Sequence, residues 1–115
     1  MDESVIDRAV YAELRDTTGA EFAAELVDTF IEEGPTMLAE LRAARAEGNA
    51  ERFRRAAHSL KSNGRTFGAV KLTTLAREFE LNGLDADPTR DAAGLEALET
   101  ECARAAAELK ALRNG

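Results

Sequence analysis

The sequence predicts an all-α fold, an antiparallel up-down-up-down four-helix bundle with a short extra helix at the N-terminus. The chain is rich in Ala, Glu, Leu and Arg and contains only two prolines. Apolar residues recur at helical spacing along most of its length, and no segment alternates as a strand would. The segments are joined by short connections, which favour antiparallel neighbours. The 115 residues suit a single domain, residues 1–115, with one core.

The N-terminal half predicts a short helix followed by a long one. The short helix is expected over residues 4–15, with Val5, Ile6, Ala9 and Val10 on one side. The segment Thr18-Gly19-Ala20-Glu21 has the pattern of a capping box, which begins a helix. The long helix is expected to end near Gly48, with a kink at Gly34-Pro35 because proline removes a backbone donor. Its apolar positions are Phe22, Leu26, Phe30, Leu38 and Leu41.

The C-terminal half predicts three further helices. Asn49 is a favourable N-cap for a helix that runs to about Phe67, where Gly68 is suited to a C-terminal stop. The next helix is expected to end near Gly83, and Asp87-Pro88 is typical of an N-cap followed by a first-turn proline. The fourth segment has apolar residues in helical register at Leu72, Leu75, Ala76 and Phe79. The last segment has a heptad seam, which consists of Leu95, Leu98, Cys102, Ala105, Leu109 and Leu112.

Charge and composition exclude several classes of function. The net charge of −7 argues against bulk nucleic-acid binding, because such modules are usually basic. The single cysteine, Cys102, cannot form an intrachain disulfide, and its spacing predicts that it is buried. We find no apolar run long enough to span a membrane and no signal peptide, so we expect a cytoplasmic protein. The charge is uneven, however, because residues 52–77 contain seven basic residues and no acidic one.

The only histidine, His58, lies within this basic segment and on its polar side. At about 100° per residue, His58 falls about 160° from Leu60, which lies in the apolar stripe. That stripe also contains Phe53, Ala56, Ala57, Gly64 and Phe67, and with Phe22 and Phe30 the phenylalanines are predicted to belong to the core. The side chains predicted to surround His58 are Arg54, Arg55, Lys61, Ser62 and Arg65. An exposed imidazole among cations is suited to handle an anion, and phosphate is the first candidate.

The spacing around His58 fits a phosphoryl acceptor. Imidazole has an ordinary pKa of ~6.5, so at neutral pH it is largely unprotonated and able to act as a nucleophile. Lys61 and Ser62 follow at i+3 and i+4, which are neighbouring positions on a helix surface. The Lys61 ammonium can reach a phosphate on His58, and the small Ser62 leaves room for a partner. Arg54 and Arg65 would attract phosphoryl oxygens on the same face.

The segment Ala57-His58-Ser59-Leu60-Lys61-Ser62 followed by Phe67-Gly68-Ala69 resembles the signature of histidine-containing phosphotransfer (HPt) domains. The resemblance covers roughly Thr18 to Glu80, and the last helix agrees in character only. Phe79 stands where leucine is usual, Gly64 replaces a more common serine or alanine, and Thr66 replaces a frequent asparagine.

The resemblance implies a carrier in a phosphorelay of two-component signal transduction, and not an enzyme acting alone. It implies that His58 is phosphorylated on its outward ring nitrogen, that Lys61 assists the phosphate, and that Ser62 keeps the site open. Gly68 would end the helix near the site. The implied partners are response-regulator receiver domains and a hybrid histidine kinase, with any Mg²⁺ held by the receiver and no cofactor on this chain. We expect a monomer, and the compact length beginning at Met1 favours a free-standing protein over a kinase module.

Other interpretations of the residues remain open at this point. A lone histidine is often only a polar surface residue, and the bundle could bind and inhibit a receiver or kinase without accepting phosphate. A basic stripe for nucleic-acid backbones is a weaker possibility, because the remainder of the chain is acidic. One histidine and one cysteine cannot form a closed metal site. Glycine-rich nucleotide loops are absent, so the chain has no kinase motif.

Overall fold

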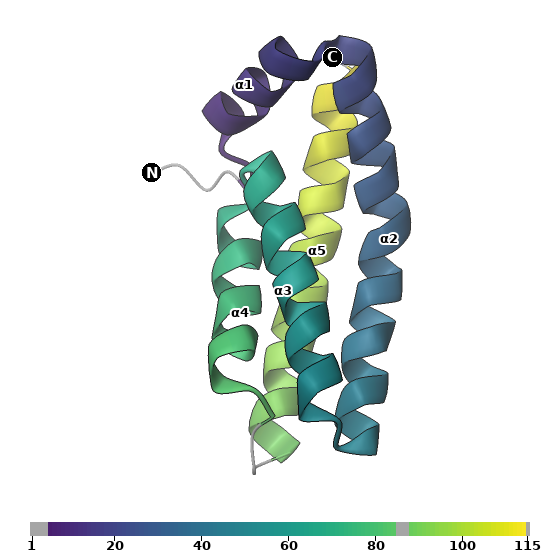
Figure 1. Cartoon of the computed structure of the whole chain (residues 1–115). Helices are drawn as coiled ribbons and strands as arrows, with labels where there is room; N and C mark the ends of the chain where they lie inside the picture. The colour runs from purple at the N-terminus through teal and green to yellow at the C-terminus, as the bar shows by residue number, and fades with distance from the viewer. Residues whose placement is uncertain (1–4, 85–87, 115) are drawn as a thin grey trace.

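The chain forms the predicted all-α bundle (Figure 1). The computed structural model describes residues 5–84 and 88–114, with the backbone alone for 88–91. The described residues form five helices, which are α1 (Arg8–Thr18), α2 (Ala20–Glu47), α3 (Ala50–Phe67), α4 (Val70–Asn82) and α5 (Pro88–Asn114). None of these helices is both long enough and apolar enough to cross a membrane.

The four helices α2 to α5 run alternately up and down the long axis of the molecule (Figure 1). Each helix of the bundle packs against two others, in the pairs α2–α3, α3–α4, α4–α5 and α5–α2. The helix α1 lies across the end of the bundle where α2 begins, and it contacts α2 and α3. The helix α3 is therefore held between α2 and α4, and one of its faces is left toward solvent.

The core consists mostly of the apolar stripes that the sequence predicts on α2 to α5. On α1 the buried side chain is Tyr11, which the sequence pattern did not single out, whereas Ala9 of the predicted stripe is exposed. Phe53 is fully buried and its ring meets Phe79 edge-on, with centroids 5.5 Å apart, while Phe30 and Phe67 lie 5.4 Å apart. Cys102 and the rest of the predicted α5 seam are buried, except that Leu112 is only partly covered. The expectation for Phe22 is wrong, because its side chain is 50% exposed near the start of α2.

The N-terminal segment departs from the predicted helix over residues 4–15. The helix α1 begins at Arg8, because the carboxylate of Asp7 caps it by accepting a hydrogen bond from Ala9 N at 3.1 Å. Ile6 precedes the helix, is fully buried and forms an isolated antiparallel bridge with Ala69. The Asp7 N–H donates to Gly68 O at 2.7 Å. Pairing with the α3–α4 connection therefore replaces the expected first helical turn, and Ser4 lies outside the described residues.

The expected capping box at Thr18 is also wrong. Thr18 ends α1, and its hydroxyl donates to Leu14 O at 2.8 Å instead of capping α2. Gly19 alone separates the two helices, with φ at +93°, a value that glycine adopts readily. Its N–H donates to Arg15 O and its carbonyl accepts from Ala23 N, so one residue closes α1 and opens α2.

The helix α2 continues through Pro35, the position at which the sequence predicts a kink. Pro35 is exposed, whereas Gly34 and Leu38 face the core on either side of it. Proline removes one backbone hydrogen-bond donor on the solvent side of α2. The helix stays continuous because the residues on either side of the proline are buried against the core. The helix ends at Glu47 with Gly48 as its C-cap, as expected.

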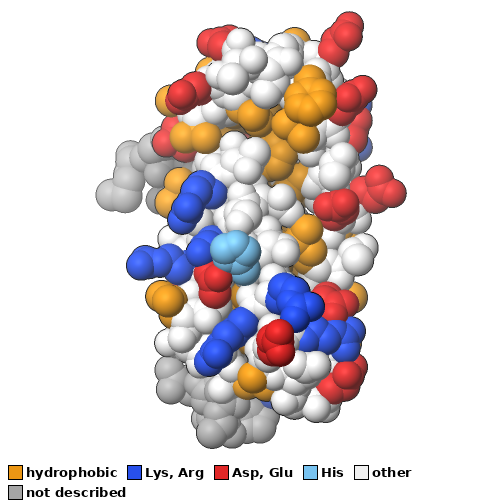
Figure 2. Space-filling view, viewed as in Figure 1, with side chains coloured by type: hydrophobic (Ala, Val, Ile, Leu, Met, Phe, Trp, Pro, Cys, Tyr) orange, Lys and Arg blue, Asp and Glu red, His pale blue; other side chains and the backbone are white. Residues whose placement is uncertain are grey.

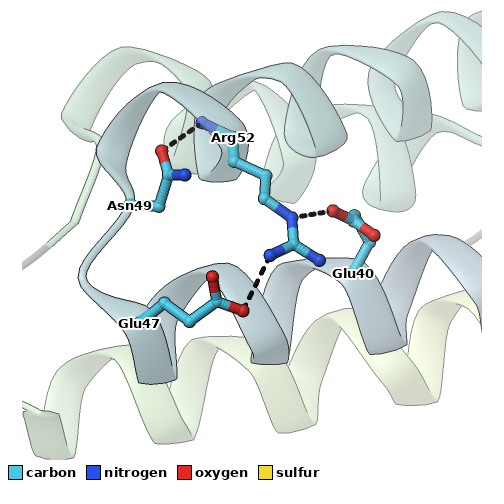
Figure 3. Close-up of polar contacts among 4 residues, drawn as sticks. All are labelled: Glu40, Glu47, Asn49 and Arg52. Carbon is cyan, nitrogen blue, oxygen red and sulfur yellow. Dashed lines mark hydrogen bonds and ion pairs between the residues drawn. The ribbon is translucent and has the colours of Figure 1, made fainter.

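The boundaries of α3 are those that the sequence predicts. The Asn49 side chain accepts a hydrogen bond from Arg52 N at 3.1 Å, and the Arg52 guanidinium bridges Glu40 and Glu47 of α2 (Figure 3). At the other end, Gly68 adopts φ +75° and its N–H donates to Arg65 O. The helix that carries His58 is therefore fixed to α2 at its start and ends in a left-handed glycine.

Two glycines set how closely α4 approaches its neighbours. A Cβ built on Gly64 would lie 2.7 Å from Thr73 Oγ1, so α3 and α4 require a glycine here. A Cβ on Gly94 of α5 would lie 2.6 Å from the Phe79 ring. The bulky Phe79, which stands where leucine is usual in the resemblance, is thus accommodated by the absence of a side chain on the facing helix. The helix α4 ends at Asn82 before Gly83 and α5 begins at Pro88, as expected, while the predicted cap Asp87 lies outside the described residues.

Gly64→Ala is expected to lower the free energy of unfolding by about 1 kcal/mol in urea denaturation. The overpacking cost of about 1–3 kcal/mol exceeds the gain in helix propensity of about 1 kcal/mol. Thr73 cannot turn away freely, because its hydroxyl donates to Ala69 O at 2.7 Å. In a Thr73→Ala background the same change is expected to be neutral or stabilising. Equal losses in both backgrounds would show that the α3–α4 contact is not the cause.

Candidate functional site

His58 lies near the middle of α3 on the face that no other helix covers. Its side chain is 57% exposed. Figure 2 shows the chain's only histidine in the centre of one face, among lysine and arginine side chains and beside an acidic one. Hydrophobic side chains gather on the same face toward the end of the bundle where α1 lies. The imidazole is therefore open to a macromolecular partner and is not enclosed in a pocket.

A carboxylate from the neighbouring helix binds one nitrogen of the ring. Glu80 of α4 places Oε2 2.6 Å from His58 Nδ1. An ionised carboxylate can only accept hydrogen bonds, so Nδ1 carries the ring proton and donates a hydrogen bond to Glu80. In the neutral ring the lone pair then lies on Nε2. The contact thus orients the imidazole and makes Nε2 the nucleophilic atom.

Lys61 binds the second oxygen of the same carboxylate. Its Nζ lies 2.5 Å from Glu80 Oε1, and the two side chains are only 17% and 24% exposed. The hydrogen bond from Lys61 is the main cause that lowers the pKa of Glu80, and the hydrogen bond from His58 lowers it further, while partial burial acts in the opposite direction. Glu80 therefore stays ionised and holds His58 and Lys61 together, one on each oxygen.

Sequence reasoning did not identify Glu80 as part of the site. It follows His58 by 22 residues and lies just beyond the acid-free segment. The signal that would have found it is the turn at Gly68-Ala69, since residues equally far on either side of a tight helical hairpin face each other. Counting outward from that turn brings Glu80 opposite His58.

Two other predicted residues lie close to His58 on the same face. Ser62 is exposed one turn further along α3, and Arg54 is exposed one turn before His58. The Arg54 guanidinium lies against Gly83, because a Cβ built on that glycine would come within 3.0 Å of Arg54 Nε and Nη2. Three side chains therefore lie in a row along the side of α3 next to α4, namely Arg54, His58 and Lys61.

Arg65 and Gly68 lie farther from His58 than the other predicted residues. Arg65 is seven positions along α3, about 10 Å at 1.5 Å per residue, and lines a shallow pocket with Val10 and Gly68. Gly68 is buried, and a Cβ there would lie 2.8 Å from Val10 Cβ. Its position indicates packing under α1, and it does not approach the imidazole.

The basic segment is less cationic in three dimensions than in sequence. Arg52 is paired with Glu40 and Glu47 of α2, and Arg55 is paired with Glu51 at 2.9 Å. These acids precede the segment along the chain, so a count of charges from 52 to 77 misses them. The predicted basic surround of His58 therefore also includes a carboxylate, since Glu80 contacts the ring, the only acid to do so within the part of the chain described.

This arrangement can support nucleophilic attack by Nε2 on an electrophile brought by a partner. The nucleophile is exposed, its tautomer is set by Glu80, and an ammonium lies within one turn of it. Among residues 5–84 and 92–114 no group of three or more potential ligands could hold a metal ion.

Comparisons with known proteins identify a family and a similar fold. The sequence model of the family described as Hpt domain matches residues 25–115. The fold is similar to the crystal structure of histidine-containing phosphotransfer protein B (HptB) from Pseudomonas aeruginosa PAO1, with a TM-score of 0.87 and 29% sequence identity. That match covers 98% of this chain and 97% of the other. No curated protein sequence gives a significant match.

Proposed function

This chain belongs to the Hpt domain family, and from that premise we propose that His58 accepts a phosphoryl group from a receiver-domain aspartyl phosphate and passes it to a second receiver. The family's role is histidine phosphotransfer in two-component phosphorelays, as a carrier and not as a kinase. The proposal for this chain is a monomeric cytoplasmic intermediate. The observation that carries the assignment to His58 is its contact with Glu80, which occupies Nδ1 and leaves the lone pair of Nε2 free on a side chain that is mostly exposed.

The proposed reaction is an in-line displacement at phosphorus. Nε2 attacks the phosphoryl group as its bond to the aspartate oxygen breaks, and the aspartate leaves with the electron pair. Lys61 offsets the charge on the phosphoryl oxygens, and Arg54 adds a second cation one turn away. Mg²⁺ would be held by the receiver. The carrier contributes orientation, because the bundle holds its nucleophile in one place.

The partner must supply a concave surface around the acceptor. His58 projects from the exposed face of α3, so a receiver would close over it and exclude water. The exposed Ser62 next to it leaves space for that approach. Receiver domains and a hybrid histidine kinase are therefore the proposed partners.

Incubation with phosphorylated receivers tests the proposal. We expect label on His58 that is labile in acid and stable in base, as is typical of a phosphoramidate. Complex formation with receivers but no label on the chain would instead support a module that binds and inhibits its partners. Salt-sensitive DNA binding without transfer would contradict the proposal in favour of a nucleic-acid role.

Ser62→Phe is expected to slow transfer from a receiver by about 100-fold, because a misplaced partner loses the aligned geometry of attack. Ser62 is exposed, so the fold should be unaffected. Ser62→Ala is the matched control and should cost less than about 10-fold, the effect of one hydrogen bond of about 1 kcal/mol. Phosphoramidate, a donor small enough to pass the phenyl ring, should still label Ser62→Phe. Loss of that labelling as well would show that the defect is not one of partner access.

A further inference from the structure

A hollow of about 360 Å³ lies between α2 and α5, in a part of the bundle that the acceptor site on α3 does not use. Its inner walls are buried side chains of the core, among them Phe30, Leu38 and Cys102. Its outer walls are low, because the exposed residues there include the alanines Ala39 and Ala103. Apolar pockets of this size between the helices of a bundle are typical binding sites for small molecules.

Contacts on either side of the hollow fix the spacing of α2 and α5. A Cβ built on Gly34 of α2 would lie 2.9 Å from the Sγ of Cys102, so the two helices already touch at the level of the core. Farther along the helices, Arg113 of α5 forms an ion pair with Asp28 of α2 at 2.8 Å. The hollow therefore exists between two helices whose separation is set elsewhere, and a ligand would not have to open it.

The charge at the hollow is confined to one ion pair, between Arg42 of α2 and Glu99 of α5, within the part of the chain that the structure describes. The two side chains are 50% and 58% exposed, and exposed ion pairs contribute little to stability, so each partner can be exchanged at small cost. The guanidinium donates to Glu99 through Nη2 alone, which leaves its other N–H groups available to a second acceptor.

We propose that this hollow binds a free α-amino acid with a large apolar side chain, above all an aromatic one. The side chain of the ligand fills the apolar interior and lies against the ring of Phe30. Its carboxylate binds the guanidinium of Arg42, and its ammonium group binds the carboxylate of Glu99. One cation and one anion at the same opening are thus complementary to the two opposite charges of a zwitterion.

Ligands with a single charge fit the same opening less well. A carboxylate without an ammonium group would displace Glu99 from Arg42 and leave two negative charges side by side. An amine without a carboxylate would displace Arg42 and place two positive charges together. The net charge of −7 also disfavours an anionic ligand, whereas a zwitterion brings no net charge.

The test is a titration of the full chain with three probes that share one phenyl-containing skeleton, followed by ¹⁵N–¹H NMR shifts in α2 and α5. The probes are L-phenylalanine, phenylpropionate, which lacks the ammonium group, and phenethylamine, which lacks the carboxylate. We expect L-phenylalanine to bind with a Kd of roughly 1 mM, as suits a ligand of this size. Each of the other two should bind about 10-fold more weakly, because one charged group of the opening is left without its partner.

Equal affinity for the three probes would overturn the proposal. So would the absence of saturable shifts at about 20 mM L-phenylalanine, far above the expected Kd.

Two alanine variants of α5 locate the binding. Ala103 and Ala107 are both exposed, but only Ala103 lines the hollow. Ala103→Leu should weaken the binding of L-phenylalanine by at least about 10-fold, because the new side chain occupies the space of the ring. Ala107→Leu, the matched control, should bind as the wild type does. Equal binding by the two variants would place the ligand elsewhere and contradict the proposal.

Three charge variants test the recognition of the zwitterion. Arg42→Gln and Glu99→Gln should each weaken the binding of L-phenylalanine about 10-fold, and in Glu99→Gln its advantage over phenylpropionate should disappear. Asp28→Asn is the control, because it breaks the other ion pair between the same two helices. An equal loss in Asp28→Asn would show that the spacing of the helices is responsible, and would overturn the assignment. None of these measurements involves phosphotransfer, so this site and the proposed function are tested separately.

Discussion

Replacing His58 with glutamine is expected to abolish phosphoryl acceptance, a loss of more than about 1,000-fold, because an amide nitrogen has no free lone pair with which to attack. The side chain is 57% exposed, so the bundle should remain folded. The ring is mostly exposed and Glu80 keeps Lys61 as its other partner, so losing the contact between His58 and Glu80 should lower the free energy of unfolding by no more than about 1 kcal/mol. The measurement is label transfer from a phosphorylated receiver, read beside urea unfolding of the same protein.

The controls for this substitution are Ser59→Ala, at the partly buried position next to His58, and Glu78→Ala, at an exposed acid of α4. Neither change removes a ring nitrogen. Both should accept label at rates close to that of the wild type. Acid-labile label on His58→Gln would contradict the assignment of the acceptor. Loss of label together with loss of cooperative unfolding would point to a structural failure instead.

Phe53→Ala is expected to have the largest effect on stability, about 3–5 kcal/mol, or a fall in Tm of roughly 10–20 °C. Phe53 is fully buried on α3 and its ring meets Phe79 edge-on, so truncation removes apolar contacts on both helices and leaves a cavity. Domains of this size are stable by only about 5–15 kcal/mol, so a large part of the margin is lost. Thermal unfolding followed by circular dichroism measures the change.

Phe22→Ala provides the matched comparison, since it removes the same ring from a half-exposed position on α2. Its cost should stay within about 1 kcal/mol. Similar losses for the two variants would mean that the core is not centred on the α3–α4 interface.

Local sequence signals predicted the helix that carries the acceptor. Asn49 and Gly68 bound α3 through their own chemistry, a side-chain acceptor in one case and a positive φ in the other. The period of the apolar stripe placed His58 and Ser62 on the solvent-facing side, with Lys61 at its edge. These features depend on residues within a few positions of each other, which is the range over which a sequence pattern is informative.

The features that were missed depend on contacts between distant segments. Thr18 matched a capping box, yet Gly19 forms the junction and Thr18 stays in α1. The start of α1 is set by the pairing of Ile6 with Ala69, which lies at the other end of α3. Glu80 reaches His58 only because α3 and α4 pack antiparallel. A helical period identifies the face of a residue, but not which side chain of the next helix meets it.

The engagement of Nδ1 by Glu80 leaves a single ring nitrogen, Nε2, for every reaction of His58. In the proposed relay the upstream and downstream receivers must therefore use one atom in turn and cannot form a ternary complex around it. Such a carrier shuttles between two forms, which is the kinetic order known as ping-pong. Flux then depends on the relative abundance of the competing receivers, and a large excess of either one would occupy the carrier unproductively and slow the signal.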